Sequence, residues 1–102
     1  MRKYVIKRDG TETRFEKSNI LNTIAAAYKE VHSDRGEAIA MDTARFVYKT
    51  NIRNWLVSQG YRKLKTDEIR TVVERALMQH CPAVAKAYII KGYIDHNENK
   101  EN

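Results

Sequence analysis

The sequence predicts an α+β fold, in which a four-helix bundle is capped by a small three-stranded β-sheet. Three observations lead to this prediction. An Asp-Gly step separates two short extended runs near the N-terminus, four later segments repeat apolar residues at helical spacing, and one short run lies between the second and third of these segments. Helices with apolar stripes pack together to bury them, so the strands are expected at one end of the bundle.

The N-terminal hairpin is predicted around Asp9 and Gly10. Tyr4 begins the first run, and the run after the turn alternates Thr and Phe with charged residues as far as Phe15. Glycine adopts a positive φ at little cost, which favours a tight turn at this step. A hairpin alone is marginally stable in water, so it must lie against an apolar surface.

The first two helices are predicted from their apolar periodicity. The first spans residues 18–32, with Ser18 as its N-cap. The second follows Asp34 and Glu37, which stand at capping-box spacing, and ends near Gly60.

The remaining elements are short or begin with clear signals. Residues 61–65 suit one more strand, with Leu64 as its aliphatic anchor. Thr66 caps the third helix and is followed by two acidic residues that complement the helix dipole. Pro82 opens the fourth helix, because the N–H that proline lacks has no partner in a first turn.

Length and composition favour one folded domain over residues 1–94, followed by a disordered polar tail over residues 95–102. The chain has 102 residues, of which 42% are hydrophobic and 31% are charged. No apolar run is long enough to span a bilayer, and no signal peptide is recognisable, so a cytoplasmic location without membrane attachment is expected. Cys81 is the only cysteine, which excludes an internal disulfide and is consistent with a reducing compartment.

The formal net charge of +6 favours anionic partners, whether nucleotide phosphate, nucleic acid or an acidic surface. Lys7 and Arg8 flank the hairpin turn, where they either face solvent or hold phosphate oxygens. Arg45, Lys49 and Arg53 lie four residues apart and form a basic ridge that is either a solvated helix face or a track for a nucleic-acid backbone.

Other classes of site lack support in the sequence. The three histidines share no ligand spacing with Cys81, so no structural metal is expected. There is no Walker-type loop and no Ser-His-Asp order, so the domain is not expected to be an enzyme.

Four motifs occur in one order: "VIKRDG", a strand that ends in Phe15, "KTDEIRTVVERALM" and "AVAKAYII". Together they resemble the ATP-cone domain, the nucleotide-sensing module of many ribonucleotide reductases and of the transcriptional repressor of reductase genes. The resemblance covers residues 4–91. It implies that ATP or dATP binds as an allosteric ligand, with or without Mg²⁺, between the sheet and the helices.

The resemblance assigns nine residues to the nucleotide site. Ile20 and Ile69 would sandwich the purine, and the basic hairpin residues would hold the triphosphate. Two positions depart from the family pattern. Asn19 stands where lysine is usual. Gly92 interrupts the run of basic residues that is usual there, and Lys91 can take the place of that run. The nine residues are Val5, Lys7, Arg8, Asn19, Ile20, Thr66, Ile69, Arg70 and Lys91.

The resemblance therefore implies a non-catalytic regulatory module that controls a partner such as ribonucleotide reductase. Two alternatives remain open at this point. The basic ridge suits a nucleic-acid-binding, transcription-linked module, and the same fold without nucleotide binding would serve as a protein-interaction domain. Homo-oligomerisation, the preferred nucleotide and the presence of further domains also remain open.

Overall fold

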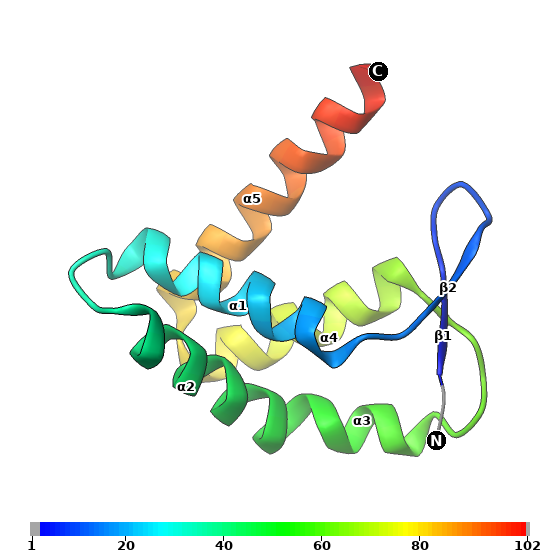
Figure 1. The fold of residues 1–102 in the computed structure, drawn as a ribbon, viewed down its shortest axis with the longest axis horizontal. Helices are drawn as coiled ribbons and strands as arrows, with labels where there is room; N and C mark the ends of the chain where they lie inside the picture. Colours follow the sequence, from blue (N-terminus) through cyan, green and yellow to red (C-terminus); the bar gives the residue numbers. More distant parts are fainter. Residues whose placement is uncertain (1–2, 102) are drawn as a thin grey trace.

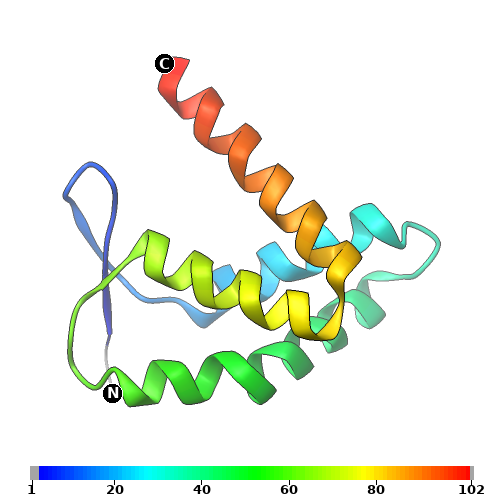
Figure 2. The same cartoon turned by 180° about the vertical axis from the view of Figure 1, so that it is seen from behind.

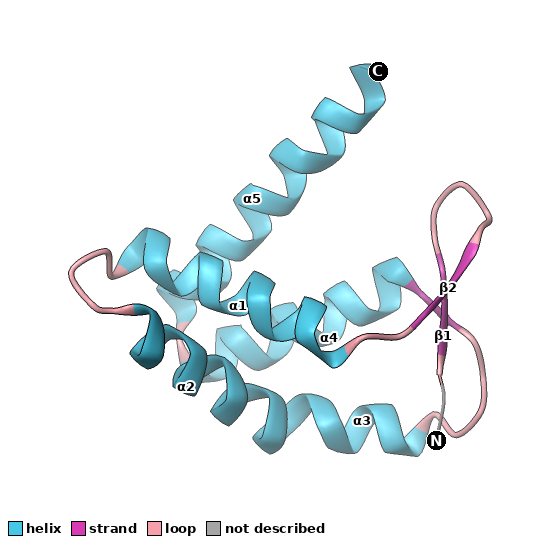
Figure 3. Ribbon diagram, in the orientation of Figure 1, coloured by secondary structure: helices cyan, strands magenta, loops and turns pink. Residues whose placement is uncertain are grey.

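A small sheet closes one end of a helical bundle, as Figure 1 shows for the computed structural model. The structure describes the backbone of residues 3–101 and the side chains of residues 3–91. Figure 3 shows the strands together at one end of the bundle, on the side where α1 and α4 begin. The elements in chain order are β1 (Tyr4–Ile6), β2 (Glu12–Arg14), α1 (Lys17–Val31), α2 (Glu37–Val47), η1 (Tyr48–Ile52), α3 (Arg53–Ser58), β3 (Leu64–Lys65), α4 (Thr66–His80) and α5 (Pro82–Glu101).

The predicted α+β class is confirmed, and β1 is the central strand of the sheet. It pairs antiparallel with β2 and parallel with β3, in the order β2-β1-β3. Val5 lies opposite Leu64, which is fully buried and is the predicted anchor of the third strand. The parallel pairing brings together segments that are almost sixty residues apart, and it places the start of α4 beside the end of β1.

The hairpin turn is built around Gly10, whose φ is +90°. The Gly10 amide donates to the Lys7 carbonyl at 2.9 Å, and the Lys7 amide donates to the Thr11 carbonyl at 2.8 Å. Asp9 Oδ1 accepts hydrogen bonds from the Thr11 amide at 3.0 Å and from the Thr11 hydroxyl at 2.7 Å. The predicted positive φ is therefore confirmed at Gly10, and the Asp9 side chain closes the loop.

The predicted N-caps are wrong. α1 begins at Lys17 with Glu16 at its N-cap position, so Ser18 lies within the first turn. Gly36 occupies the N-cap position of α2, and neither helix has a side-chain cap bond, so the predicted capping box does not form. The extended backbone of the preceding strand and loop determines where each helix begins.

Thr66 is also not a cap, because Lys65 still belongs to β3 and occupies the N-cap position of α4. The Thr66 hydroxyl instead lies 3.4 Å from the Ile6 carbonyl oxygen, on the neighbouring strand. The two acidic residues expected in the first turn, Asp67 and Glu68, are there.

The second predicted helix contains a π-helical segment that the apolar pattern did not indicate. Residues 37–58 run as α2, η1 and α3 without a break in the helical path. Tyr48 and Ile52, at the two ends of η1, are both buried, together with Val47. A π-helical turn contains more residues than an α-helical turn, so it changes the direction in which the following side chains point. Val47, Tyr48 and Ile52 can therefore all face the core.

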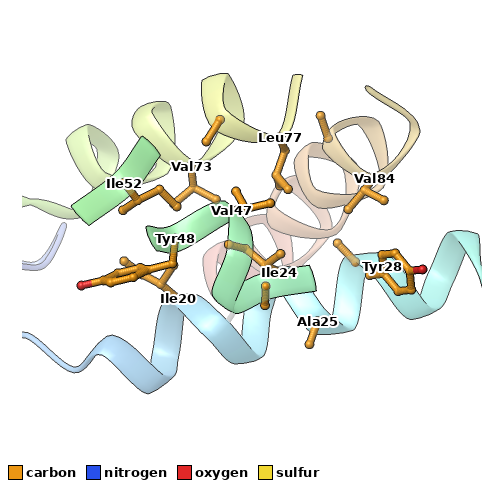
Figure 4. Packing of buried hydrophobic residues seen from close by; sticks show 14 of the residues in the cluster. Ile20, Ile24, Ala25, Tyr28, Val47, Tyr48, Ile52, Val73, Leu77 and Val84 are labelled. Atoms are coloured by element: carbon orange, nitrogen blue, oxygen red, sulfur yellow. The ribbon is translucent and has the colours of Figure 1, made fainter. Parts of the chain in front are cut away.

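The core lies between the helices and continues under the sheet. Its largest fully buried side chains come from five helical segments and β3, and no described buried residue is polar or charged. Figure 4 shows the side chains of α1, α4 and α5 packed around the α2–η1 segment. The fully buried side chains are Ile24, Val47, Ile52, Leu64, Val73, Leu77 and Val84.

The last helix begins at Pro82 as predicted and extends away from the bundle, as Figures 1 and 2 both show. Its backbone is helical through Glu101, past residue 94, where the sequence predicts the end of the folded domain. A helix that projects beyond the core does not define a domain boundary, so that boundary stays a prediction. No helix in the described part of the chain is both long and apolar enough to cross a membrane.

Candidate functional site

A pocket of about 270 Å³ lies where the sheet meets α1, α4 and α5. Its volume is close to the lower end of the ~300–1,000 Å³ typical of small-molecule sites. A group the size of a nucleobase with a sugar fits this volume. Its lining residues are Val5, Lys7, Thr13, Arg14, Phe15, Glu16, Asn19, Ile20, Thr23, Thr66, Ile69, Arg70 and Tyr88.

Seven of the nine residues assigned by resemblance line this pocket. Three chain segments supply them: β1 and the residue after it, the first turn of α1, and the first two turns of α4. The seven are Val5, Lys7, Asn19, Ile20, Thr66, Ile69 and Arg70.

Apolar side chains from different elements face the pocket. Ile20 on α1 is only 6% exposed, and Ile69 on α4 is half-buried against the core. Phe15, which ends the second extended run, is also half-buried, and its amide donates to the Lys3 carbonyl at 2.7 Å. These surfaces can hold a flat, weakly polar group such as a nucleobase.

The charged lining favours an anion. Lys7, Arg14 and Arg70 contribute three cations, against one carboxylate from Glu16. Phosphate oxygens accept charge-assisted hydrogen bonds from such groups.

The acidic residues of the first turn of α4 do not line the pocket, and an arginine pairs with each of them. Arg8 Nη2 lies 2.7 Å from Asp67 Oδ1, and Arg62 Nη2 lies 2.8 Å from Glu68 Oε2. The hydrogen bond from Arg62 lowers the pKa of Glu68 below its ordinary value. The two arginines therefore partly offset the repulsion that Asp67 and Glu68 exert on an anion near this helix end.

The structure does not bring Arg8 and Lys91 to the pocket. Arg8 lies at the hairpin tip beside Asp67. Lys91 lies in a separate depression, with Lys29 and Glu30 among its neighbours, between the far part of α1 and α5. Their assignment to the site stays a prediction that rests on the resemblance.

Sequence reasoning missed six lining residues, which lie on β2, at the two positions after it, on α1 and on α5. Alternation along the second strand could have placed Thr13 on the same face as Phe15, and Thr23 lies one helical turn after Asn19. Tyr88 packs partly buried against the core from α5, as an ordinary core residue would. No signal in the sequence distinguished Arg14 or Glu16 from ordinary surface residues.

Tyr88 is half-buried and has polar contacts at the pocket. Its ring centroid lies 5.7 Å from Arg70 Cζ. Burial raises the pKa of its hydroxyl, and the positive charge of Arg70 partly opposes that effect. Tyr88 therefore contacts α4 through Arg70 and shares the pocket lining with Thr23 of α1.

The described residues contain no group of three or more His, Cys, Asp or Glu side chains that could hold a metal ion. A magnesium ion that accompanies a nucleotide does not require such a group, because phosphates and water supply most of its ligands.

The basic ridge of Arg45, Lys49 and Arg53 lies elsewhere, along α2, η1 and α3. All three residues are exposed, and Arg45 pairs with Asp42 at 3.2 Å. None of the three lines the pocket.

Comparison with known proteins agrees with this arrangement. A search of curated proteins found no match. The model of a protein family described as the ATP cone domain matches residues 3–96, a range that includes every lining residue of the pocket. The chain therefore belongs to the ATP-cone domain family, whose members are non-catalytic regulatory modules that bind ATP or dATP.

Proposed function

We propose that this domain binds ATP or dATP in the pocket between its sheet and its helices, and that occupancy of the pocket regulates a partner, ribonucleotide reductase or a related protein. One observation carries the proposal. Residues from segments about sixty positions apart in the chain, already assigned by family resemblance, converge on one pocket with apolar walls and three cations.

The proposed pose follows from the chemistry of the lining. The purine lies between Ile20 and Ile69, whose side chains offer apolar surface from two different helices. The phosphates extend toward Lys7 and Arg70, and Arg14 adds a third cation. Charge-assisted hydrogen bonds contribute ~1.5–3 kcal/mol each. A few of them, with burial of the base, suffice for micromolar affinity, which corresponds to about −8 kcal/mol.

Regulation requires that the nucleotide prefer one state of the domain or of its assembly. A ligand shifts an equilibrium only by its difference in affinity for the two states. The pocket is lined by residues of the sheet, α1, α4 and α5, so a bound nucleotide contacts several elements at once and can favour one relative placement of them. We therefore expect the partner's affinity to depend on nucleotide, and the nucleotide's affinity to depend on the partner.

Isothermal titration calorimetry with ATP and with dATP, each with and without Mg²⁺, tests the binding step. Lys7→Ala removes a lining cation and should weaken binding about tenfold or more, the equivalent of one charge-assisted hydrogen bond. Lys49→Ala is the matched control, because it removes the same charge from an exposed position outside the pocket. The affinity of the Lys49→Ala variant for nucleotide should equal that of the wild type.

The same proteins distinguish the alternatives. No heat with millimolar nucleotide would leave a protein-interaction domain that has lost its ligand. Binding of duplex DNA without nucleotide, weakened by salt and by Lys49→Ala but not by Lys7→Ala, would instead support the basic ridge as a nucleic-acid surface. Sedimentation with and without ATP would show whether occupancy changes the oligomeric state.

A further inference from the structure

Tyr88 connects α5 to α4 at the edge of the pocket. It belongs to α5, and its ring lies under the guanidinium of Arg70 on α4. Tyr88, Arg70 and Thr23 of α1 all line the pocket, and the Thr23 hydroxyl donates to the Ile20 carbonyl at 2.9 Å. Tyr88 is therefore in direct contact with the lining cation Arg70.

The contact with the ring restricts an otherwise mobile cation. An arginine side chain has many rotamers, and its planar guanidinium packs favourably on an aromatic face. Among the residues described with side chains, Arg70 has no ion pair with a carboxylate. Glu74, one turn further along α4, acts electrostatically on Tyr88. The tyrosine ring thus holds Arg70 at the pocket without neutralising its charge.

We propose that Tyr88 is a positioning residue of the nucleotide site, which acts through Arg70. A cation that is already held in its binding conformation loses less conformational freedom when an anion arrives. The same ring ties the pocket to α5, the helix that extends beyond the bundle (Figure 2). The inference rests on the proposed function, because the anion it concerns is the nucleotide.

A double-mutant cycle with ATP as the probe tests the coupling. Tyr88→Leu removes the ring but keeps an apolar side chain, Arg70→Met removes the charge but keeps the length, and the two are combined. Tyr88→Leu should weaken ATP binding about three- to tenfold, the range expected for a partly desolvated cation–π contact. In the Arg70→Met background the same change should have little effect, because the group on which Tyr88 acts is then absent.

Two further variants separate positioning from a general structural role. Tyr88→Phe keeps the ring, removes only the hydroxyl, and should bind ATP close to wild-type affinity. Tyr61→Leu is the matched control, since Tyr61 is 84% exposed and does not line the pocket. It should leave ATP affinity unchanged. Thermal unfolding of each variant shows whether the fold is retained.

A measurement made without nucleotide tests this inference separately from the proposed function. In NMR spectra, the side-chain resonances of Arg70 should show a ring-current shift that Tyr88→Leu removes and Tyr88→Phe preserves. Additive losses in the cycle, or equal losses in the Phe and Leu variants, would overturn the inference even if ATP binds. If the ring-current shift is present and ATP does not bind the wild type, the proposed function fails and the contact is only structural.

Discussion

Asp67→Asn is expected to lower the stability of the fold and to raise its affinity for ATP. Asp67 lies in the first turn of α4, directly after the pocket residue Thr66, and its carboxylate holds the guanidinium of Arg8 at 2.7 Å. A triphosphate at the pocket mouth would be repelled by Asp67 and would compete with it for Arg8. Asparagine keeps the size of the side chain and removes the charge.

The expected stability loss is small. The side chains of Arg8 and Asp67 are 46% and 65% exposed, so their ion pair is worth ~0.2–1 kcal/mol. Loss of a negative charge from the helix N-terminus removes ~0.3–1 kcal/mol more. The free energy of unfolding should therefore fall by about 1 kcal/mol, which a denaturant titration can measure.

The affinity should change in the opposite direction. Released from the carboxylate, Arg8 can donate to a phosphate, and such a bond contributes ~1.5–3 kcal/mol before the cost of ordering the side chain. We expect a gain of about three- to thirtyfold in ATP affinity by calorimetry, and a smaller gain at high salt because both groups are exposed.

Glu68→Gln is the matched control, because Glu68 lies in the same turn but pairs with Arg62 rather than Arg8. It should lower stability by a similar amount with little gain in affinity. The gain from Asp67→Asn should also be much smaller in an Arg8→Ala background. If Asp67→Asn weakens ATP binding instead, the Arg8–Asp67 pair holds the hairpin in its binding position and does not compete with the ligand.

Three further predictions concern the fold. Leu64→Ala, at a fully buried position, should lower the free energy of unfolding by ~2–5 kcal/mol. Val57→Ala is the control and should change it little, because Val57 is 62% exposed. Equal losses in the two variants would contradict the burial of β3. Gly10→Ala forces a side chain into a φ of +90° and should cost about 1–2 kcal/mol in chemical unfolding, so an unchanged midpoint would mean that the turn can relax. Because Arg62 lowers the pKa of Glu68 below its ordinary value of 4.5, this pair contributes stability above that pH and loses it as the pH falls toward the lower folded-state pKa. Melting temperatures measured across that pH range should fall less steeply for Glu68→Gln than for the wild type, and identical slopes would refute the linkage.

Local patterns were sufficient to predict the strands and the helical stretches of this fold, but not the π-helical segment within one of them. The glycine at the hairpin turn, the proline at the start of α5 and the aliphatic anchor of β3 all act within a few residues of themselves. Helix starts were less predictable. Ser18 and Thr66 are good caps in isolation, but the extended backbone before each helix ends earlier than the sequence suggests, at Glu16 and at Lys65. These two residues therefore take the cap positions instead.

The π-helical segment also depended on tertiary packing. Tyr48 and Ile52 have the spacing of an ordinary helix, and nothing in their identity calls for a wider turn. The turn widens where consecutive residues, Val47 and Tyr48, must both face the core.

By itself, the sequence determined the order of strands and helices, the basic hairpin and the likeness to a nucleotide-binding family, because turns, stripes and motifs are properties of neighbouring residues. Only the tertiary structure decided which residues line the pocket. It brought Arg14 and Tyr88 into the lining, paired Arg8 with Asp67 and placed Lys91 in another depression. The physical reason is that a pocket forms where distant segments converge, and the parallel pairing of β1 with β3, which no local pattern encodes, sets that convergence.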